Sequence, residues 1–219
     1  MDIAVIGMSG IFPKANDLDE FYFNLFNGVD SVRELPERRR VGGEIEKSDV
    51  LGYLDQIDEF DYKFFNISRA EAENMDPHQR MLLQLVCGAI ENAGYSLEEF
   101  RGSRTSIILS SPGAPKLEYL NLVEKFHPTL ITGNAHAMYA GRISYFLGLR
   151  GPAMMIDTSC SSSLTSLHES CNKLLLGEAD QAITGGIKLR TNLNFTKNFR
   201  FGIEARDNRC KAFDDSADG

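Results

Sequence analysis

The sequence is poor in the features that mark a membrane, secreted or metal-binding protein. Its 219 residues include no tryptophan and no apolar run near the roughly 20 residues that a membrane helix needs. The start, MDIAVIGM, is too short and too acidic for a secretory signal. The cysteines form no CxxC pair and no zinc-ligand spacing: Cys87, Cys160, Cys171 and Cys210. We therefore expect a cytoplasmic protein with reduced thiols, no bound metal and no membrane contact.

Positive charge is also in short supply. Lysine and arginine number 23 against 31 aspartates and glutamates, which gives a formal net charge of −8. Because no basic stripe interrupts this acidic balance, nucleic acid is not an expected partner. The hydrophobic share of 42% and the charged share of 25% are ordinary for a globular domain, and the length suffices for one sizeable core.

Short apolar segments alternate with amphipathic ones along the chain. The strands that the pattern predicts cover residues 3–6, 105–109, 153–156 and 181–187. Helices are predicted near residues 18–26, 76–93, 116–126, 134–147 and 161–175. Asp17 and Asp76 are suited to cap the first two of these helices. Strands that alternate with helices favour an α/β fold with a mostly parallel sheet.

One stretch, residues 151–187, combines a strand, a helix and a cysteine. The apolar run at 153–156 has strand length, and a helical pattern begins at Ser161 and stops at Gly177. On one face of this helix we expect the apolar side chains Leu164, Leu167, Cys171, Leu174 and Leu175. Cys160 therefore lies where a buried strand leads into the first turn of an amphipathic helix.

That position has a chemical consequence for the thiol of Cys160. The N–H groups in the first turn of a helix lack intrahelical partners, and the helix dipole favours negative charge there. A thiolate, which is the nucleophilic form of cysteine, would be stabilised, and the same N–H groups would hold an oxyanion. The small serines at 161–163 would let a substrate approach the sulfur. A second interpretation stays open: Cys160 packs as a small apolar residue without any chemistry.

Distinctive sequence blocks follow one another from end to end of the chain. The block around the thiol is Asp157-Thr-Ser-Cys-Ser-Ser-Ser-Leu164, preceded by Leu149-Arg-Gly-Pro152 and followed by Gly185-Gly186. Others are IAVIGMSG at 3–10, FFNIS at 64–68, MDPHQR at 75–80, ENAGY at 91–95, TGNA at 132–135, AGRISY at 140–145 and RCKAFD at 209–214. In content and order these blocks resemble the β-ketoacyl synthase family, in particular the ketosynthase domains of modular polyketide synthases.

The resemblance implies a thiolase-like α/β fold with αβαβα layers, in which the mostly parallel sheet carries a buried nucleophile-bearing helix. It implies that Cys160 accepts an acyl chain from the phosphopantetheine thioester of an acyl carrier protein, and that the backbone N–H of Cys160 is an oxyanion donor. Decarboxylative Claisen condensation with a malonyl-type extender would follow. Five further residues are implied to bind substrate: Thr158, Ser159, Ser161, Thr132 and Asn134. No bound cofactor is expected, and the complete domain is expected to form a homodimer.

The resemblance extends over residues 1–219 as the N-terminal half of a ketosynthase domain. The two family histidines that serve decarboxylation and condensation belong to the C-terminal half, which we expect in cis or in trans. The histidines of this chain lack a partner that would mark a base, and we interpret them as structural: His78, His127, His136 and His168. We therefore expect no condensation by this chain alone.

Two other functions stay open. A ketosynthase-like scaffold that binds carrier protein without chemistry would have the same fold, although the intact Cys160 favours an enzyme. A thiolase or chalcone-synthase relative that uses coenzyme A thioesters fits the fold but not the blocks at 75–80 and 211–214. Small departures indicate a divergent member: Ser159 stands where the family commonly has alanine, and Tyr22 where it often has tryptophan.

Overall fold

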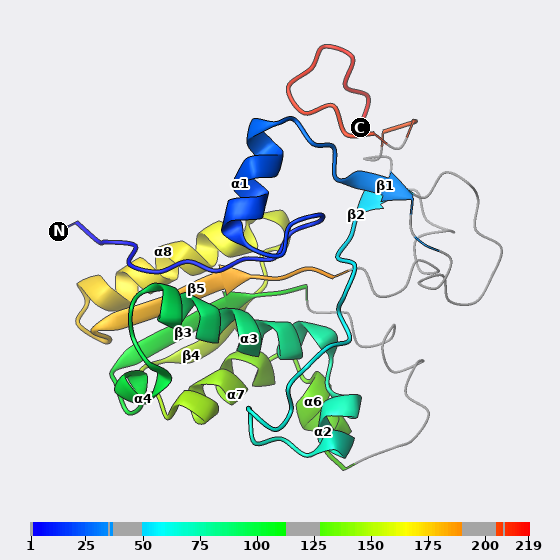
Figure 1. Ribbon diagram of the computed structural model, residues 1–219. Coiled ribbons are helices and arrows are strands. Elements are labelled where there is room, and N and C mark those ends of the chain that lie inside the picture. The colour runs from blue at the N-terminus through cyan, green and yellow to red at the C-terminus, as the bar shows by residue number, and fades with distance from the viewer. Residues whose placement is uncertain (1, 35, 37–49, 113–127, 190–204, 208) are drawn as a thin grey trace. The chain divides into compact units, whose positions relative to one another are not determined.

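The computed structural model describes residues 2–34, 36, 50–112, 128–189, 205–207 and 209–219 (Figure 1). The chain forms two compact units, each with its own elements. The larger unit contains Met1–Ile11 and Gln56–Leu189, and the smaller unit contains Phe12–Asp55 and Arg190–Gly219. The helix predicted at 116–126 and the residue His127 lie outside the described residues.

The larger unit is built on a three-stranded parallel sheet. Its strands are β3 (Thr105–Ser110), β4 (Ala153–Ile156) and β5 (Gln181–Gly186), in the order β4-β3-β5. Ile107 of β3 is paired with Ala153 on one side and with Ile183 on the other. All six residues of β3 are buried, as expected for a central strand. These strands confirm the parallel α/β arrangement that the sequence predicts.

Helices cover both faces of this sheet (Figure 1). The helices α3 (Pro77–Asn92) and α7 (Met138–Leu147) lie on one side, and α8 (Ser162–Leu175) lies on the other, in contact with all three strands. The shorter helices of the unit are α2 (Arg69–Asn74), α4 (Leu97–Phe100) and α6 (Leu130–Asn134). The sheet is therefore the middle layer of a three-layer unit.

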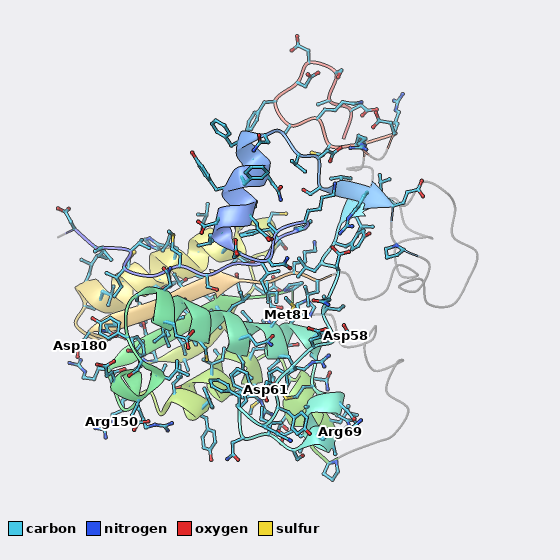
Figure 2. The ribbon with its side chains drawn as sticks, viewed as in Figure 1. Asp58, Asp61, Arg69, Met81, Arg150 and Asp180 are labelled. Atoms are coloured by element: carbon cyan, nitrogen blue, oxygen red, sulfur yellow. The ribbon has the colours of Figure 1, made fainter. Side chains whose placement is uncertain are left out.

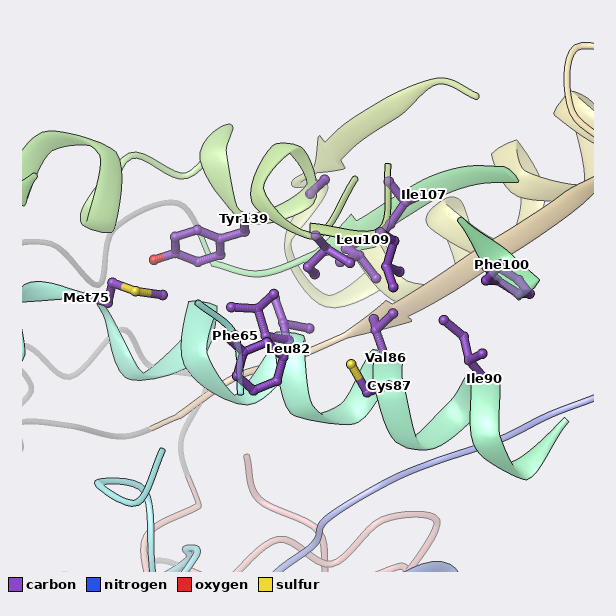
Figure 3. Packing of buried hydrophobic residues seen from close by; sticks show 14 residues of the cluster. Phe65, Met75, Leu82, Val86, Cys87, Ile90, Phe100, Ile107, Leu109 and Tyr139 are labelled. Atoms are coloured by element: carbon purple, nitrogen blue, oxygen red, sulfur yellow. The ribbon is translucent and has the colours of Figure 1, made fainter. Parts of the chain in front are cut away.

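The main hydrophobic core lies between β3 and the helices α3 and α7 (Figure 3). Its buried members are Phe65, Met75, Leu82, Leu83, Val86, Cys87, Ile90, Phe100, Ile107, Leu109, Tyr139, Ala140, Ile143 and Leu147. Leu82, Val86 and Ile90 follow one another at helical spacing along α3, which is why the sequence pattern identified this helix.

Backbone bonds hold the segments that lead into the sheet. Figure 2 labels Arg150 and Asp180, which lie toward the same end of the larger unit. The N–H of Arg150 donates to the carbonyl of Ser103 at 2.9 Å, and the N–H of Asp180 donates to that of Arg104 at 2.8 Å. Both acceptors lie directly before β3. The start of β5 is aligned with the start of β3, since Gln181 is paired with Thr105. β4 begins two residues further along β3, with Ala153 opposite Ile107.

Two sequence predictions about the larger unit were wrong in detail. Residues 3–6 form neither a strand nor a helix, and Val5 is 74% exposed. An apolar run forms a strand only if its backbone N–H and C=O groups can pair with a neighbouring strand. The helix predicted at 134–147 starts later than expected, because α7 begins at Met138. Asn134 is instead the last residue of the preceding helix α6. The backbone of Ala135 between them is extended, with ψ near 120°.

The smaller unit contains α1 (Leu18–Phe26) and an antiparallel pair of strands, β1 (Val32–Glu34) and β2 (Val50–Gly52). Asp17 caps α1 as predicted, since its Oδ1 accepts the N–H of Glu20 at 2.8 Å. No residue of α1 is buried. Among the described residues of either unit, none belongs to a helix long and apolar enough to cross a membrane.

Candidate active site

Cys160 lies at the junction between a strand and a helix, as predicted. β4 ends at Ile156, and the 3₁₀ turn η2 (Ser159–Ser161) leads directly into α8. Cys160 is the middle residue of η2, and its side chain is exposed. The helix stops where the sequence indicates, because α8 ends at Leu175 and Gly177 follows with φ near +68°. A thiol with access to solvent is thus held at the head of α8.

The backbone immediately before Cys160 is strained. Ser159 has a φ of +59°, a left-handed conformation that residues other than glycine adopt uncommonly. Two side chains hold it there: Oδ1 of Asp157 accepts the N–H of Ser159 at 3.0 Å, and Oγ of Ser162 donates to its carbonyl at 2.7 Å. The sequence gives no sign of this conformation, because serine rather than glycine occupies the position.

Hydroxyl groups connect the same turn internally. Oγ of Ser161 donates to the carbonyl of Thr158 at 2.9 Å, and its oxygen also lies 2.9 Å from Oγ1 of Thr158. Oγ1 of Thr165 is 3.2 Å from Oγ1 of Thr158. The structure therefore brings Thr158, Ser159 and Ser161 together around Cys160. Their contacts within the turn are structural, and their contact with substrate stays a prediction.

The backbone of this turn is arranged to stabilise negative charge. The leading N–H groups of a helix have no intrahelical partner, and Cys160 is the second residue of η2. The role of the Cys160 N–H as an oxyanion donor stays a prediction. The longer helix α8, which follows without a break, directs the positive end of its dipole toward the same turn.

The face of α8 that packs on the sheet is not the leucine face. Its buried residues are Ser162, Ser166 and Ser170, spaced four residues apart. Leu164 is 72% exposed and Leu175 is 53% exposed. Helix α8 packs on the sheet, as expected of the nucleophile-bearing helix, but within the described residues it buries a stripe of small side chains and exposes much of its apolar face. Serines do not contribute to hydrophobic periodicity, so the sequence pattern gives no sign that this face is buried.

A close approach between β5 and the central strand explains why Gly186 is small. A Cβ atom built on Gly186 would lie 2.5 Å from Oγ of Ser110, while Cβ of Ser163 on α8 would be at an ordinary contact distance of 3.5 Å. A larger residue at position 186 would displace Ser110 of β3. Packing against β3 therefore favours glycine at position 186, beside the head of α8.

The other two predicted binding residues lie on α6. Oγ1 of Thr132 donates to the carbonyl of Thr129 at 3.0 Å. Nδ2 of the buried Asn134 donates to the carbonyls of Asn74 at 2.8 Å and Leu130 at 2.7 Å. Within the part of the chain that the structure describes, no hydrogen bond joins either side chain to the turn of Cys160. Their role in binding substrate stays a prediction.

The described histidines have partners of their own. The buried His78 holds its Nδ1 2.7 Å from Oδ1 of Asp76, and its Nε2 accepts the N–H of Leu189 at 2.9 Å. Nε2 of His136 is 2.9 Å from the carbonyl of Ser111. Nε2 of His168 is 3.2 Å from the side chain of Asn172. The buried Asp76–His78 pair links α3 to the end of the larger unit, and the sequence analysis did not anticipate it.

The described residues contain no group of three or more histidine, cysteine, aspartate or glutamate side chains placed to hold a metal ion. The described groups around Cys160 are an exposed thiol, a strained turn and the backbone N–H groups at the head of α8. The parallel α/β sheet and the cysteine at the head of a helix fit the thiolase-like class of proteins.

Within that class, the chain belongs to the β-ketoacyl synthase family, because the family's N-terminal domain matches it over residues 1–219. Polyketide synthase PksN of Bacillus subtilis strain 168 is 36% identical over 233 residues, which cover 99% of this chain and 4% of PksN. Polyketide synthase ThaG of Burkholderia thailandensis is 38% identical over 234 residues, again 99% of this chain and 4% of the relative.

A solved structure shows the same fold. The ketosynthase from module 6 of the bacillaene synthase of Bacillus subtilis 168 superposes with a TM-score of 0.84 and 35% identity. The match covers 99% of this chain and 37% of that ketosynthase. The chain thus corresponds to part of a ketosynthase domain and to a small fraction of the curated synthases.

Proposed function

We propose that this chain is the N-terminal, nucleophile-bearing half of a ketosynthase domain in polyketide assembly. Cys160 attacks the thioester carbonyl of an acyl chain that an acyl carrier protein holds on its phosphopantetheine arm. A bond forms between the sulfur and the acyl carbon, the thioester bond breaks, and the phosphopantetheine leaves as a thiol after it takes up a proton. The backbone N–H of Cys160 stabilises the oxyanion in between.

The observation that carries this proposal is the placement of Cys160: exposed, behind a left-handed residue and at the head of α8. Buried cysteines are usually inert filler, whereas reactive ones are accessible and lie beside groups that stabilise a thiolate. Membership of the β-ketoacyl synthase family supports the same assignment. Substrate thus arrives on phosphopantetheine, and no resident cofactor takes part.

The condensation step is assigned to a companion half. Decarboxylation of a malonyl-type extender and the Claisen step need acid–base groups near the sulfur. None of the described histidines is hydrogen-bonded within the turn of Cys160. The exposed leucine face of α8 offers a surface that a C-terminal half, in cis or in trans, would cover. A homodimer of the complete domain is part of this proposal.

Intact-mass spectrometry tests the acyl-transfer step directly. The chain is incubated with an acyl-phosphopantetheine thioester, with Cys160→Ala as the negative control and Cys171→Ala as a matched control on the same helix. We expect a gain of one acyl group on the parent and on Cys171→Ala, and none on Cys160→Ala.

The same measurement separates the proposal from a non-catalytic scaffold. No acylation of the chain, either alone or with the C-terminal half added, would contradict the enzyme and favour a scaffold that binds carrier protein. Acylation that persists in Cys160→Ala would assign the nucleophile to another residue.

A further inference from the structure

One serine hydroxyl spans the turn that holds Cys160. Oγ of Ser162 donates to the carbonyl of Ser159 at 2.7 Å, and it accepts the N–H of Thr158 at 2.8 Å. Cys160 lies between Ser159 and Ser162 in the chain, so both bonds close the backbone segment that carries the thiol. Ser162 is buried at 8% exposure, and water therefore competes little for these two bonds.

The turn needs such a brace because its conformation is unfavourable. A residue other than glycine in the left-handed region costs about 1–3 kcal/mol and persists only where its surroundings hold it. The side chains of Asp157 and Ser162 each make one hydrogen bond to the backbone of Ser159. The hydroxyl of Ser162 also holds the backbone of Thr158, one residue earlier.

A neighbouring serine shows that this arrangement is not a general feature of the buried face of α8. Ser166 lies one turn further along, fully buried, and its Oγ donates to the carbonyl of Ser162 at 2.8 Å inside the helix. Ser166 and Ser162 thus share residue type, helix face and burial, but only Ser162 bonds to the turn before the helix. Packing against the sheet explains why a small side chain is buried at Ser166. It does not explain why Ser162 makes two hydrogen bonds to the turn.

We propose that Ser162 is a positioning residue, whose hydroxyl holds Ser159 in its left-handed conformation and thereby sets the exposure and reactivity of the Cys160 thiol. The hydroxyl undergoes no change of bonding in this role and touches no substrate. The inference deepens the proposed function, on which it rests for the use made of the thiol. The geometry of the turn itself is independent of that use.

Two measurements on the chain test this inference. Hydrogen exchange by NMR reports the protection of the Thr158 amide, and mass spectrometry follows the rate at which iodoacetamide alkylates Cys160. The variants are Ser162→Ala, Ser162→Thr, which keeps the hydroxyl, and Ser166→Ala as the matched control. Circular dichroism and thermal unfolding establish that each variant is folded.

In Ser162→Ala we expect the Thr158 amide to exchange at least tenfold faster and the alkylation rate of Cys160 to change at least threefold. Ser162→Thr and Ser166→Ala should stay within twofold of the parent in both measurements. The inference is overturned if Ser162→Ala behaves as the parent, or if Ser166→Ala has the same effect. Should Ser162→Ala fail to fold, Ser162→Thr decides, because a threonine that protects Thr158 less than the parent would contradict it.

These outcomes are separate from those of the proposed function. Iodoacetamide needs only an accessible thiol, with no carrier arm and no oxyanion. A parent chain that takes up no acyl group, either alone or with the C-terminal half added, refutes the acyl-transfer proposal, and alkylation and exchange still decide the role of Ser162.

Discussion

At the scale of single residues, the left-handed backbone of Ser159 is the feature that distinguishes this site from an ordinary helix start. A β-branched side chain is especially unfavourable at a φ of +59°. We expect Ser159→Val to lower the free energy of unfolding by about 2 kcal/mol. Ser159→Gly should stay within about 1 kcal/mol of the parent, because relief of strain is offset by chain entropy. Urea titrations measure both.

The control for this pair is Ser163→Val, at an exposed position within α8. Its backbone is helical, so valine should cost no more than about 0.7 kcal/mol there. Equal losses at positions 159 and 163 would show that the strain at Ser159 is energetically unimportant.

A second prediction at this scale concerns the buried carboxylate of Asp76. Burial raises its pKa, but the hydrogen bonds that the carboxylate accepts from the ring Nδ1 and the backbone N–H of His78 outweigh burial and hold the pKa below the ordinary 3.8. Because the pKa is lowered in the folded state, this stabilisation is present above pH 3.8 and is lost as the pH falls through the lowered value. Removing Oδ1 would also leave two N–H groups of His78 unpaired.

We expect Asp76→Ala to lower the free energy of unfolding at pH 7 by about 3 kcal/mol, since it breaks a buried pair and removes the cap of α3. The difference from the parent should shrink as the pH falls below 4. Urea titrations at pH 7 and pH 3.5 check both statements. The exposed Asp180→Asn is the control, and a constant difference across this range would contradict the proposed ionisation.

At the scale of elements, the sequence correctly predicted helices and strands whose ends are marked by capping or strand-bounding residues. β4 occupies Ala153–Ile156 as expected, because Pro152 and Asp157 bound the apolar run. α3 begins after Asp76 with Pro77 in its first position. These residues act on their immediate neighbours in the sequence, so the rest of the fold does not change where the element begins or ends. The thiol at the head of α8 was predictable for the same reason.

What the sequence did not predict depends on contacts that polar and small residues make. The face of α8 that packs on the sheet is a stripe of serines, Ser162, Ser166 and Ser170. The partner of His78 is the N–H of Leu189, 111 residues away. The left-handed Ser159 depends on hydrogen bonds from side chains two and three residues away. Hydrophobic periodicity contains none of this information, because each case is settled by polar or small residues.

The helix α3 carries a buried thiol that makes its own prediction. Burial, and secondarily the charge of Glu91, raises the pKa of Cys87 to about 11. In the unfolded chain the thiol ionises near pH 9, while in the folded chain it stays protonated. Stability is therefore complete below pH 9 and falls as the pH rises toward 11, by about 2 kcal/mol from this group.

Replacing Cys87 should remove the loss of folding stability at alkaline pH that this thiol causes. We expect Cys87→Ala to be less stable than the parent at pH 8, by about 1–2 kcal/mol of lost packing. By pH 10.5 the difference should be nearly gone, because only the parent has a thiol at position 87 to ionise on unfolding. Guanidinium titrations at both pH values measure the two differences, and equal differences would contradict a raised pKa.

At the scale of the whole molecule, the leucine face of α8 connects stability with function. Leu164 and Leu175 lie about 16 Å apart along the helix axis, at 1.5 Å per residue. Both are mainly exposed, so replacing them should change the free energy of unfolding by less than about 0.5 kcal/mol. If a C-terminal ketosynthase half covers this face, the same leucines become buried on association.

The double variant Leu164→Lys, Leu175→Lys tests this directly against a separately expressed C-terminal half. Burial of two leucines contributes about 3 kcal/mol or more, so we expect the variant to bind that half at least about 100-fold more weakly than the parent does. Calorimetric titration measures the affinity, and Tyr145→Ser, at an 89% exposed position on α7, is the control. A variant that binds as tightly as the parent would show that this face stays uncovered. A variant that loses several kcal/mol of stability before any partner is added would show that the leucines already pack within the chain. Weaker binding at unchanged stability is the one result that assigns the leucine face to the companion half, and it would explain why α8 places serines against its own sheet and leucines outward.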